Sequence, residues 1–429
     1  MRGVLYLYII ASLMTFGLMT KAEAKGAASK PTISAKQDTT LTVSLITCWP
    51  GSEIYELCGH EAIRIKGDGI DSVWNFGLFD FTEPNFVYRF VKGETDYSVG
   101  GYPFRYFLPE YIQRGSKVAE QVLNLTPAQA RKIREMLQTK SLPQNRRYRY
   151  NYIRNNCSTQ VADIIDEATD GKIEYNDSVR YGSFREVMSH YHKNYPWYQF
   201  GINLALGSEL DQPLKARDEF FVPTEYFRYM STATLPGGIP AVKQTNILNE
   251  GRDEAVLPPT PWYGGPLFWS IVVAAISILT ILLCRKGSTG FNLWYSIYYG
   301  IAGLAGCLIF FLVFFSEHAA TSPNMLIFWL NPLQLVIPAL IWTNRFRPAV
   351  NAMMWINICV SVVMLIFWPI YSKGQSHEAS FLILIGSDLL LSAFYALKGK
   401  QGEQEKSKAY KGKKPRRQTR TKTNRKKKK

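Results

Sequence analysis

Five long apolar runs in the last third of the chain limit its possible folds more than any other feature. Each run has the length of about 20 residues that a membrane-spanning helix needs. The sequence therefore predicts an integral membrane protein, with an all-α bundle of five transmembrane helices over residues 258–398. The runs are Leu267–Cys284, Trp294–Phe315, Met325–Trp342, Ala352–Tyr371 and Ala379–Leu397.

Positive charges in the connecting loops predict the orientation of these helices. Arg285 and Lys286 follow the first run, and Arg345 and Arg347 follow the third. The loop between the second and third runs, residues 316–323, has no Lys or Arg. Because Lys and Arg collect on the cytoplasmic side of a membrane, the loops after runs one, three and five are predicted to be cytoplasmic. Everything before the first run then lies outside the inner membrane.

A basic tail follows the last run. Residues 398–429 contain 16 Lys or Arg and two Glu, which accounts for most of the formal net charge of +16. A basic balance of this kind can indicate nucleic-acid binding. Here we favour a disordered cytoplasmic tail, residues 399–429, that lies against anionic lipid headgroups, and we expect no nucleic-acid partner.

The first residues resemble an export signal. Arg2 precedes the apolar stretch Val4–Met19, and a small-residue cleavage pattern, Ala-Glu-Ala, ends at Ala24. This order is typical of a signal peptide, residues 1–24, although an uncleaved anchor is the alternative. Residues 25–40 are polar and are interpreted as a linker. Residues 41–257 then form an exported, periplasmic domain that is long enough for a core of its own.

Strand and helix patterns are mixed in this domain, without strict alternation, which favours an α+β fold. Strands are predicted where apolar and polar residues alternate or β-branched residues cluster, and helices where apolar residues return at helical spacing. Thr126-Pro127-Ala128-Gln129 is a capping box with proline at the first helical position. The predicted strands are Leu41–Cys48, Glu61–Lys66, Asp71–Gly77, Thr95–Gly100 and Lys117–Leu125, and the predicted helices are Pro127–Lys140 and Asn156–Ala168.

Cys157 stands at the start of the second predicted helix, in Asn155-Asn156-Cys157-Ser158-Thr159. A helix N-terminus favours a thiolate and can also stabilise an oxyanion, so a lowered thiol pKa is expected. A cysteine nucleophile needs a base, and His60 in Gly59-His60-Glu61-Ala62 enters a predicted strand. Asn75 lies in the neighbouring strand and is predicted to orient the imidazole.

Other interpretations of these residues remain open. Asp71 and Asp80 compete with Asn75 as the orienting residue. Without the other residues, Cys157 is explained nearly as well by a buried apolar cysteine as by a nucleophile. Cys48 and Cys58 can form a disulfide in an oxidising periplasm, which leaves Cys157 as a free thiol, but Cys58 can also pair with Cys157. His190 and His192 are weak evidence for a metal, so no metal or cofactor is expected.

Arginines and tyrosines alternate just before the Cys157 motif. Arg147, Arg149, Tyr152 and Arg154 belong to this stretch. Arginine pairs well with phosphate, and tyrosine is common at membrane interfaces. These four residues are therefore candidates for substrate binding, and a solvated strand with aromatic packing is the alternative.

The segments GHEAIRI, WNFGLFDF and NNCSTQVADII resemble the circularly permuted papain-like group, which includes lecithin:retinol acyltransferase. In that group the histidine strand precedes the Asn-Cys helix. Residues 40–399 as a whole resemble the Lnb-type lipoprotein N-acyltransferases, which have a periplasmic papain-like domain followed by five transmembrane helices. The resemblance implies a lipoprotein N-acyltransferase with Cys157, His60 and Asn75 as its catalytic residues.

The implied reaction moves an acyl chain from a membrane phospholipid to Cys157 as a thioester. The N-terminal amine of a diacylated, exported lipoprotein then accepts the acyl chain. Two other functions are possible for the same residues. One is an NlpC-type cysteine peptidase or amidase acting on cell-wall peptides. The other is a non-enzymatic membrane assembly factor for exported proteins, in which His60 and Cys157 need not meet.

Overall fold

The computed structural model describes residues 41–79, 82, 84–252, 257–371, 375 and 378–412, all of which belong to one compact unit. The predicted signal peptide, the predicted linker at residues 25–40, Asp80 and the end of the basic tail lie outside the described residues. We call residues 41–252 the sheet domain and residues 257–412 the membrane segment.

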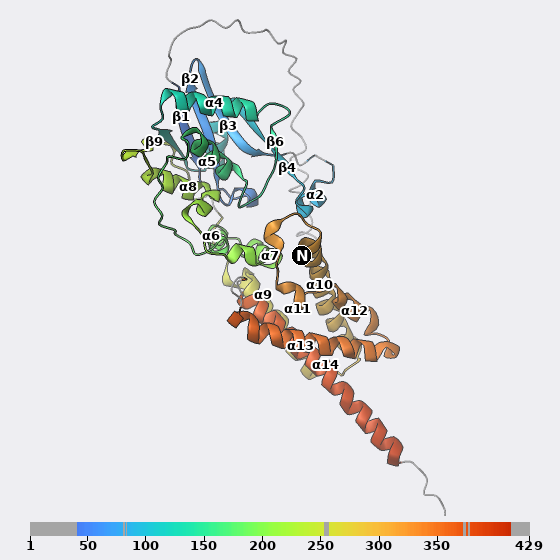
Figure 1. Ribbon diagram of the computed structural model, residues 1–429. Coiled ribbons are helices and arrows are strands. Elements are labelled where there is room, and N and C mark those ends of the chain that lie inside the picture. The colour runs from blue at the N-terminus through green and yellow to red at the C-terminus, as the bar shows by residue number, and fades with distance from the viewer. Residues whose placement is uncertain are drawn as a thin grey trace, which may run out of the picture. The chain divides into compact units, whose positions relative to one another are not determined.

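The sheet domain is built on a seven-stranded sheet in which every neighbouring pair of strands is antiparallel (Figure 1). The order across the sheet is β6-β4-β3-β2-β1-β5-β9. The five strands predicted from the sequence are confirmed. The strands are β1 (Thr42–Cys48), β2 (His60–Gly67), β3 (Ile70–Leu78), β4 (Asp96–Pro103), β5 (Val118–Leu123), β6 (Arg147–Arg149) and β9 (Val242–Asn249), with a separate hairpin of β7 (Thr234–Leu235) and β8 (Ile239–Pro240).

Two of the helices were predicted from the sequence, the first with its observed start and the second from Asn156, one residue before its observed start. At the start of helix α4 (Pro127–Lys140), the Thr126 backbone N–H donates to Gln129 Oε1 over 2.9 Å. This is one of the two hydrogen bonds of the predicted capping box. The other begins at Cys157, with Asn156 as its cap. The helices of the sheet domain are α2 (Phe86–Lys92), α3 (Phe104–Arg114), α4 (Pro127–Lys140), α5 (Cys157–Ala168), α6 (Phe184–Tyr191), α7 (Pro196–Ala205) and α8 (Pro223–Thr232).

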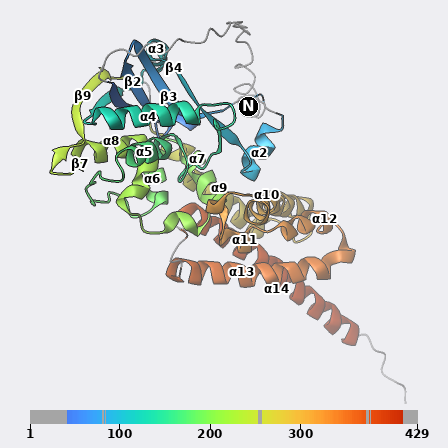
Figure 2. The same ribbon diagram turned by 45° about the horizontal axis from the view of Figure 1, so that its top comes forward.

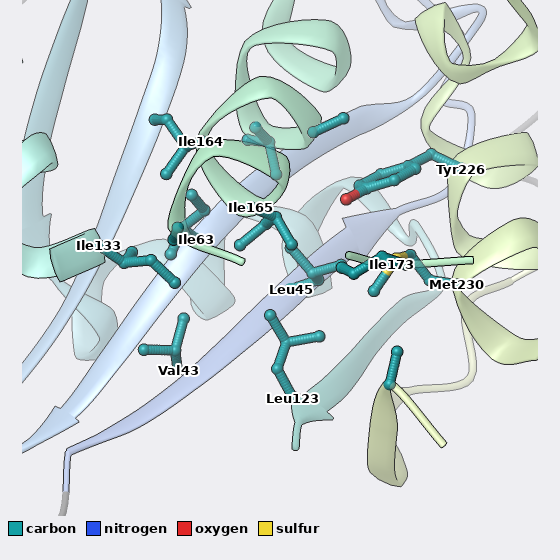
Figure 3. Packing of buried hydrophobic residues seen from close by; sticks show 14 of the residues in the cluster. Val43, Leu45, Ile63, Leu123, Ile133, Ile164, Ile165, Ile173, Tyr226 and Met230 are labelled. Atoms are coloured by element: carbon teal, nitrogen blue, oxygen red, sulfur yellow. The ribbon is translucent and has the colours of Figure 1, made fainter. Parts of the chain in front are cut away.

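The main core lies between one face of the sheet and helices α4, α5 and α8. Ile164 and Ile165 of α5 point toward Leu45 and Ile63 of the central strands (Figure 3). The residues next to Leu45 and Ile63 along the strands, such as Ile46 and Ala62, face the opposite side of the sheet. There they pack with Phe107 of α3 in a second cluster. This period of two is the strand geometry that the alternating sequence predicts. Each fully buried Leu or Ile contributes about 1.5–3 kcal/mol, so α5 is held firmly against the sheet.

The membrane segment contains four helices that are long and apolar enough to cross a bilayer. Helices α13 and α14 run alongside one another (Figure 2). The four, with their full bounds, are α9 (Pro266–Leu283), α10 (Thr289–Phe314), α13 (Arg347–Tyr371) and α14 (Ala379–Gly412).

The third predicted span is not a continuous helix, which corrects that prediction. It consists of α11 (Leu326–Trp329), the 3₁₀ turn η7 (Pro332–Leu335) and α12 (Val336–Leu340). Asn331 has an extended backbone and precedes Pro332, and a proline cannot continue the helical hydrogen bonds of the residues before it. The sequence pattern located the segment correctly, but the prediction rested on length and apolar composition and did not consider its prolines.

Contacts at the two ends of the membrane segment show that this broken segment still runs from one end to the other. At one end, Gln375 Nε2 donates to Asn324 Oδ1 over 2.9 Å, just before α11. At the other end, Gly287 lies beside Arg347, just after α12. The two loops that were predicted to share the cytoplasmic side therefore do lie together.

Candidate active site

One edge of the sheet carries the residues singled out by the sequence. Strand β1 ends there at Cys48, β2 begins at His60 and β3 ends at Leu78. His60 pairs with Cys48, which pairs in turn with Val118 of β5. Since neighbouring strands run in opposite directions, the ends of some and the beginnings of others meet at this edge.

Asn75 contacts the ring of His60. The pairing of Ala62 with Asn75 puts both side chains on the same face of the sheet, and His60 shares that face because it lies two residues before Ala62. His60 Nε2 lies 2.9 Å from Asn75 Oδ1. This hydrogen bond fixes the plane of the imidazole and leaves Nδ1 for another partner.

Asp71, the competing orienting residue, lies elsewhere. It pairs with Lys66 at the other end of the β2–β3 hairpin. Its carboxylate accepts from both Nε and Nη2 of Arg64, each over 2.7 Å. Asp71 therefore does not contact His60. Asp80, the third candidate, lies outside the described residues.

Asn156 fixes the start of α5 and with it the position of Cys157. Its side-chain oxygen accepts from the backbone N–H groups of Ser158 and Thr159, both over 3.0 Å. Its side-chain nitrogen donates to the carbonyl oxygens of Tyr152 and Phe221. The Asn156 side chain thus caps the helix and also joins its N-terminus, by hydrogen bonds, to two other segments of the chain.

The Cys157 thiol lies among backbone N–H groups. Those of Glu61, Ser158 and Cys157 itself act to lower its pKa, as a helix N-terminus should. Burial outweighs them, so the pKa of the Cys157 thiol is raised rather than lowered. The sequence-based expectation of a lowered pKa is therefore not met, because the sequence pattern did not reveal how deeply the thiol is buried.

Cys157 approaches His60 only through the backbone. The His60 ring lies on the Ala62 face of the sheet and stacks on Tyr111 of α3 with ring centroids 6.3 Å apart, whereas Cys157 packs against the cluster on the α5 face. Glu61, whose N–H acts on the sulfur, is the residue after His60. Gly77 of β3 borders the same space, because a Cβ there would lie 4.0 Å from Cys157 Cβ. Within the described residues, no hydrogen bond joins the two side chains directly. Burial lowers the pKa of His60 while Asn75 opposes that shift, so the resting pair is a neutral thiol and a neutral imidazole.

Glu61 is a buried acid beside the thiol that sequence reasoning missed. Thr47 Oγ1 donates to Glu61 Oε2 over 2.8 Å. Burial raises the pKa of this carboxyl well above its ordinary range, and the nearby Cys157 adds to the shift. The only signal in the sequence was a charged residue at the start of an apolar strand, Glu61 within His-Glu-Ala-Ile.

At least three of the four candidates for substrate binding already contact other side chains of the protein, and Arg147 lies on the edge strand β6. Arg149 bonds Asp96 over 2.8 Å and also forms an ion pair with Glu317 of the membrane segment. Arg154 bonds Glu209 over 2.8 Å. Arg147 lies on β6 and has an exposed side chain. A phosphate that binds Arg149 or Arg154 must therefore replace an internal carboxylate.

Tyr152 points into the protein. Its hydroxyl lies 3.0 Å from Cys58 Sγ and 3.4 Å from His192 Nε2. Gln199 Oε1 lies 2.8 Å from the other ring nitrogen of His192. His192 is thus a buried residue whose ring is held by side chains of the sheet domain. Cys48, Cys58 and Cys157 are all free thiols, so neither suggested disulfide is present. Among the described residues, no group of three His, Cys, Asp or Glu side chains could hold a metal ion.

The site edge of the sheet domain contacts the membrane segment. Helix α2 follows β3 directly, and the carbonyl oxygen of Phe90 lies 2.8 Å from His318 Nε2. The backbone N–H of Glu317 donates to the Lys92 carbonyl oxygen over 2.7 Å. Val87 and Tyr88 of the same helix are exposed, by 64% and 55%. These exposed apolar side chains of α2 therefore lie near the contact between the sheet domain and the membrane segment.

Comparison with known families gives two matches, one for each part of the chain. Residues 31–190 match the family described as the Lnb N-terminal periplasmic domain. Residues 258–401 match the family described as the Lnb transmembrane domain. No curated protein and no solved structure matches the chain.

Proposed function

The chain belongs to the Lnb family, and from this premise we propose that it is a lipoprotein N-acyltransferase. The acyl donor is a phospholipid of the membrane in which the chain is embedded, and the acceptor is the N-terminal amine of a diacylated, exported lipoprotein. The sheet domain is periplasmic. Its proposed fold is the circularly permuted papain-like one, and the basic tail is proposed to be cytoplasmic.

One observation carries this proposal. Cys157 lies at a helix N-terminus beside the backbone N–H of Glu61, the residue after His60, and Asn75 orients the His60 ring over 2.9 Å. A thiol, a base and an orienting amide are the parts of a cysteine acyltransferase site. An assembly factor has no need for this arrangement. The site also lies at the edge that contacts the membrane segment, which favours a lipid substrate over a cell-wall peptide.

The first half of the reaction acylates the cysteine. His60 Nδ1 takes the proton of the Cys157 thiol, and the sulfur attacks an ester carbonyl carbon of the phospholipid. The backbone N–H groups of Glu61, Cys157 and Ser158 are placed to stabilise the negative oxygen that forms. The ester C–O bond then breaks, His60 returns the proton to the leaving oxygen, and a lysophospholipid departs from the Cys157 thioester.

The second half transfers the chain. The lipoprotein amine attacks the thioester carbonyl while His60 accepts an amine proton. The C–S bond breaks, an amide forms, and the proton returns to the Cys157 sulfur. Because the resting thiol and imidazole are both neutral, the thiolate forms only when a bound substrate brings the two groups together. A buried, uncharged thiol is also protected from oxidants between turnovers.

The direct test is mass spectrometry of the purified protein in phospholipid. A hydroxylamine-labile acyl adduct should appear on Cys157, with lysophospholipid released in equal amount. Cys157→Ser should keep the fold, because the side chains are similar in size, and should lose acyl transfer, because far less of a serine hydroxyl is ionised. If the Cys157→Ser protein N-acylates a diacylated lipoprotein at the normal rate, the covalent mechanism is wrong.

A further inference from the structure

A cavity of about 450 Å³ opens at the same sheet edge as His60, on the side of β5 and β9. One wall comes from the segment between β1 and β2, with Trp49 and Leu57. The opposite wall comes from the connection between α6 and α7, with Asn194 and Tyr195. Tyr195 Oη donates to the Ser52 carbonyl oxygen over 2.6 Å, which joins the two walls.

Three cationic side chains line this cavity: Lys117, Lys193 and Arg252. Glu250 is the one carboxylate among its lining residues. None of the three cations forms an ion pair with a carboxylate in the described part of the chain. Lys117 Nζ instead lies 5.1 Å above the Trp49 ring, and Arg252 Nη2 donates to the Gln113 carbonyl oxygen over 2.9 Å. The cavity thus keeps an excess of positive charge that the protein itself does not neutralise.

The cavity is close to the candidate active site. His60, Cys48 and Val118 form one row across three neighbouring strands, and Lys117 precedes Val118. Neighbouring strands are about 4.8 Å apart, so Lys117 begins about 10 Å from His60 along that row. The cavity and the candidate active site are therefore neighbours along one row of strand ends.

The cavity also adjoins the connection to the membrane segment. Asn194 Nδ2 donates to the Leu257 carbonyl oxygen over 2.9 Å, and Thr260 Oγ1 donates to the Asn194 carbonyl oxygen over 3.2 Å. Trp262, two residues later, is 78% exposed. Exposed tryptophan is typical of the membrane–water interface, where phospholipid headgroups lie.

We propose that this cavity binds the phosphate group of a glycerophospholipid headgroup, through Lys117, Lys193 and Arg252. The identification of the bound lipid as the acyl donor rests on the proposed function, whereas the anion site does not. Ammonium and guanidinium groups form strong, charge-assisted hydrogen bonds with phosphate oxygens.

The test uses the full-length Cys157→Ala protein in detergent, so that no turnover is possible. Calorimetry measures the binding of dihexanoylphosphatidylglycerol, of dihexanoylglycerol, which lacks the phosphate, and of inorganic phosphate. Lys117→Gln, Lys193→Gln and Arg252→Gln should each weaken binding of the phospholipid by roughly tenfold. Binding of dihexanoylglycerol should not change. Lys243→Gln, at the other end of β9, is the matched control, and thermal unfolding shows that each variant is folded.

Three outcomes decide the proposal. Equal phospholipid binding by the parent and the three variants would overturn it. Variants that lose inorganic phosphate binding while phospholipid binding stays unchanged would make the cavity a site for free anions, which also overturns it. A charge-dependent loss of phospholipid binding supports the site even if the wild-type protein never forms an acyl adduct. The phosphate site and the acyltransfer reaction are therefore tested independently of each other.

Discussion

Two thiols of the periplasmic domain each belong to a set with an imidazole and a side-chain amide. Cys157 lies beside the backbone N–H of Glu61, the residue after His60, and Asn75 contacts the His60 ring over 2.9 Å. Cys58 lies 3.0 Å from the Tyr152 hydroxyl, which lies 3.4 Å from His192, and Gln199 contacts that ring over 2.8 Å. By residue type alone, the two sets are almost interchangeable.

The two sets differ in the groups that surround the sulfur atom of the cysteine. Backbone N–H groups of a helix N-terminus act on Cys157 and favour its thiolate. No such groups act on Cys58, whose pKa burial raises to about 12 against the single hydrogen bond of Tyr152. A tyrosine also separates Cys58 from its imidazole. The comparison teaches that the position of a cysteine in the backbone, rather than a histidine nearby, makes it a candidate nucleophile.

The largest expected difference is between the two histidines. His60→Gln should slow formation of the Cys157 adduct by roughly 10²- to 10⁴-fold, because it removes the proton acceptor. His192→Gln should slow it by less than about tenfold, because His192 reaches neither the thiol nor its N–H groups. Adduct formation is followed by mass spectrometry at a fixed lipid concentration. Equal losses in the two variants would mean that the two sets act together.

The next effect concerns acid stability. Burial lowers the pKa of His192 to about 4, so the folded protein binds its proton less readily than the unfolded chain does. The contribution of neutral His192 is therefore complete above the unfolded pKa of about 6.5 and is lost as the pH falls toward 4. It amounts to about 3 kcal/mol.

Thermal unfolding between pH 7.5 and 4.5 measures this contribution. The parent protein should lose stability on acidification more steeply than His192→Gln, which has no imidazole to protonate. His60, whose pKa burial also lowers, adds a loss of the same sign in both proteins. Parallel curves for the parent and the variant would show that His192 does not titrate in this range.

The smallest expected effect belongs to Cys58. Cys58→Ala removes the contact with the Tyr152 hydroxyl and should lower the free energy of unfolding by about 1 kcal/mol. The yield of adduct on Cys157 should not change. Chemical denaturation gives the first quantity and mass spectrometry gives the second. A folded Cys58→Ala protein without an adduct would remove the distinction between the two thiols.

Local signals predicted much of the fold. The capping box at Thr126 located the start of α4, and the Asn-Cys pattern located the start of α5, because both depend on a few neighbouring residues. Helix α7 and strand β9 were missed. Strand β9 is a polar edge strand whose position depends on pairing with β5, which is distant in the sequence.

The candidate site was predicted by residue but not by environment. His60, Asn75 and Cys157 were chosen for their chemistry and order, and the structure brings them to one edge of the sheet. Burial decides whether the thiol pKa rises or falls, and burial depends on the packing of whole elements. The inward position of Tyr152 and the ion pairs of Arg149 and Arg154 likewise arise from partners that no local pattern reveals.

The broken third span has a consequence for how the protein is made. At the break, Gln334 Nε2 donates to the Trp329 carbonyl oxygen over 2.8 Å. A Cβ at Gly306 of α10 would lie 2.5 Å from the backbone of Asn331, so only glycine admits this close approach. Backbone groups freed from a helix cannot face lipid and need partners inside the protein.

The segment from Leu326 to Leu340 is also only about 22 Å long as a helix, against a hydrocarbon thickness of about 30 Å. Alone, it partitions poorly into a bilayer. Helix α10 is synthesised just before it and offers the glycine surface that it needs. We therefore expect the third span to enter the membrane as a pair with α10, and we expect a bulky side chain at Gly306 to impair insertion during biogenesis.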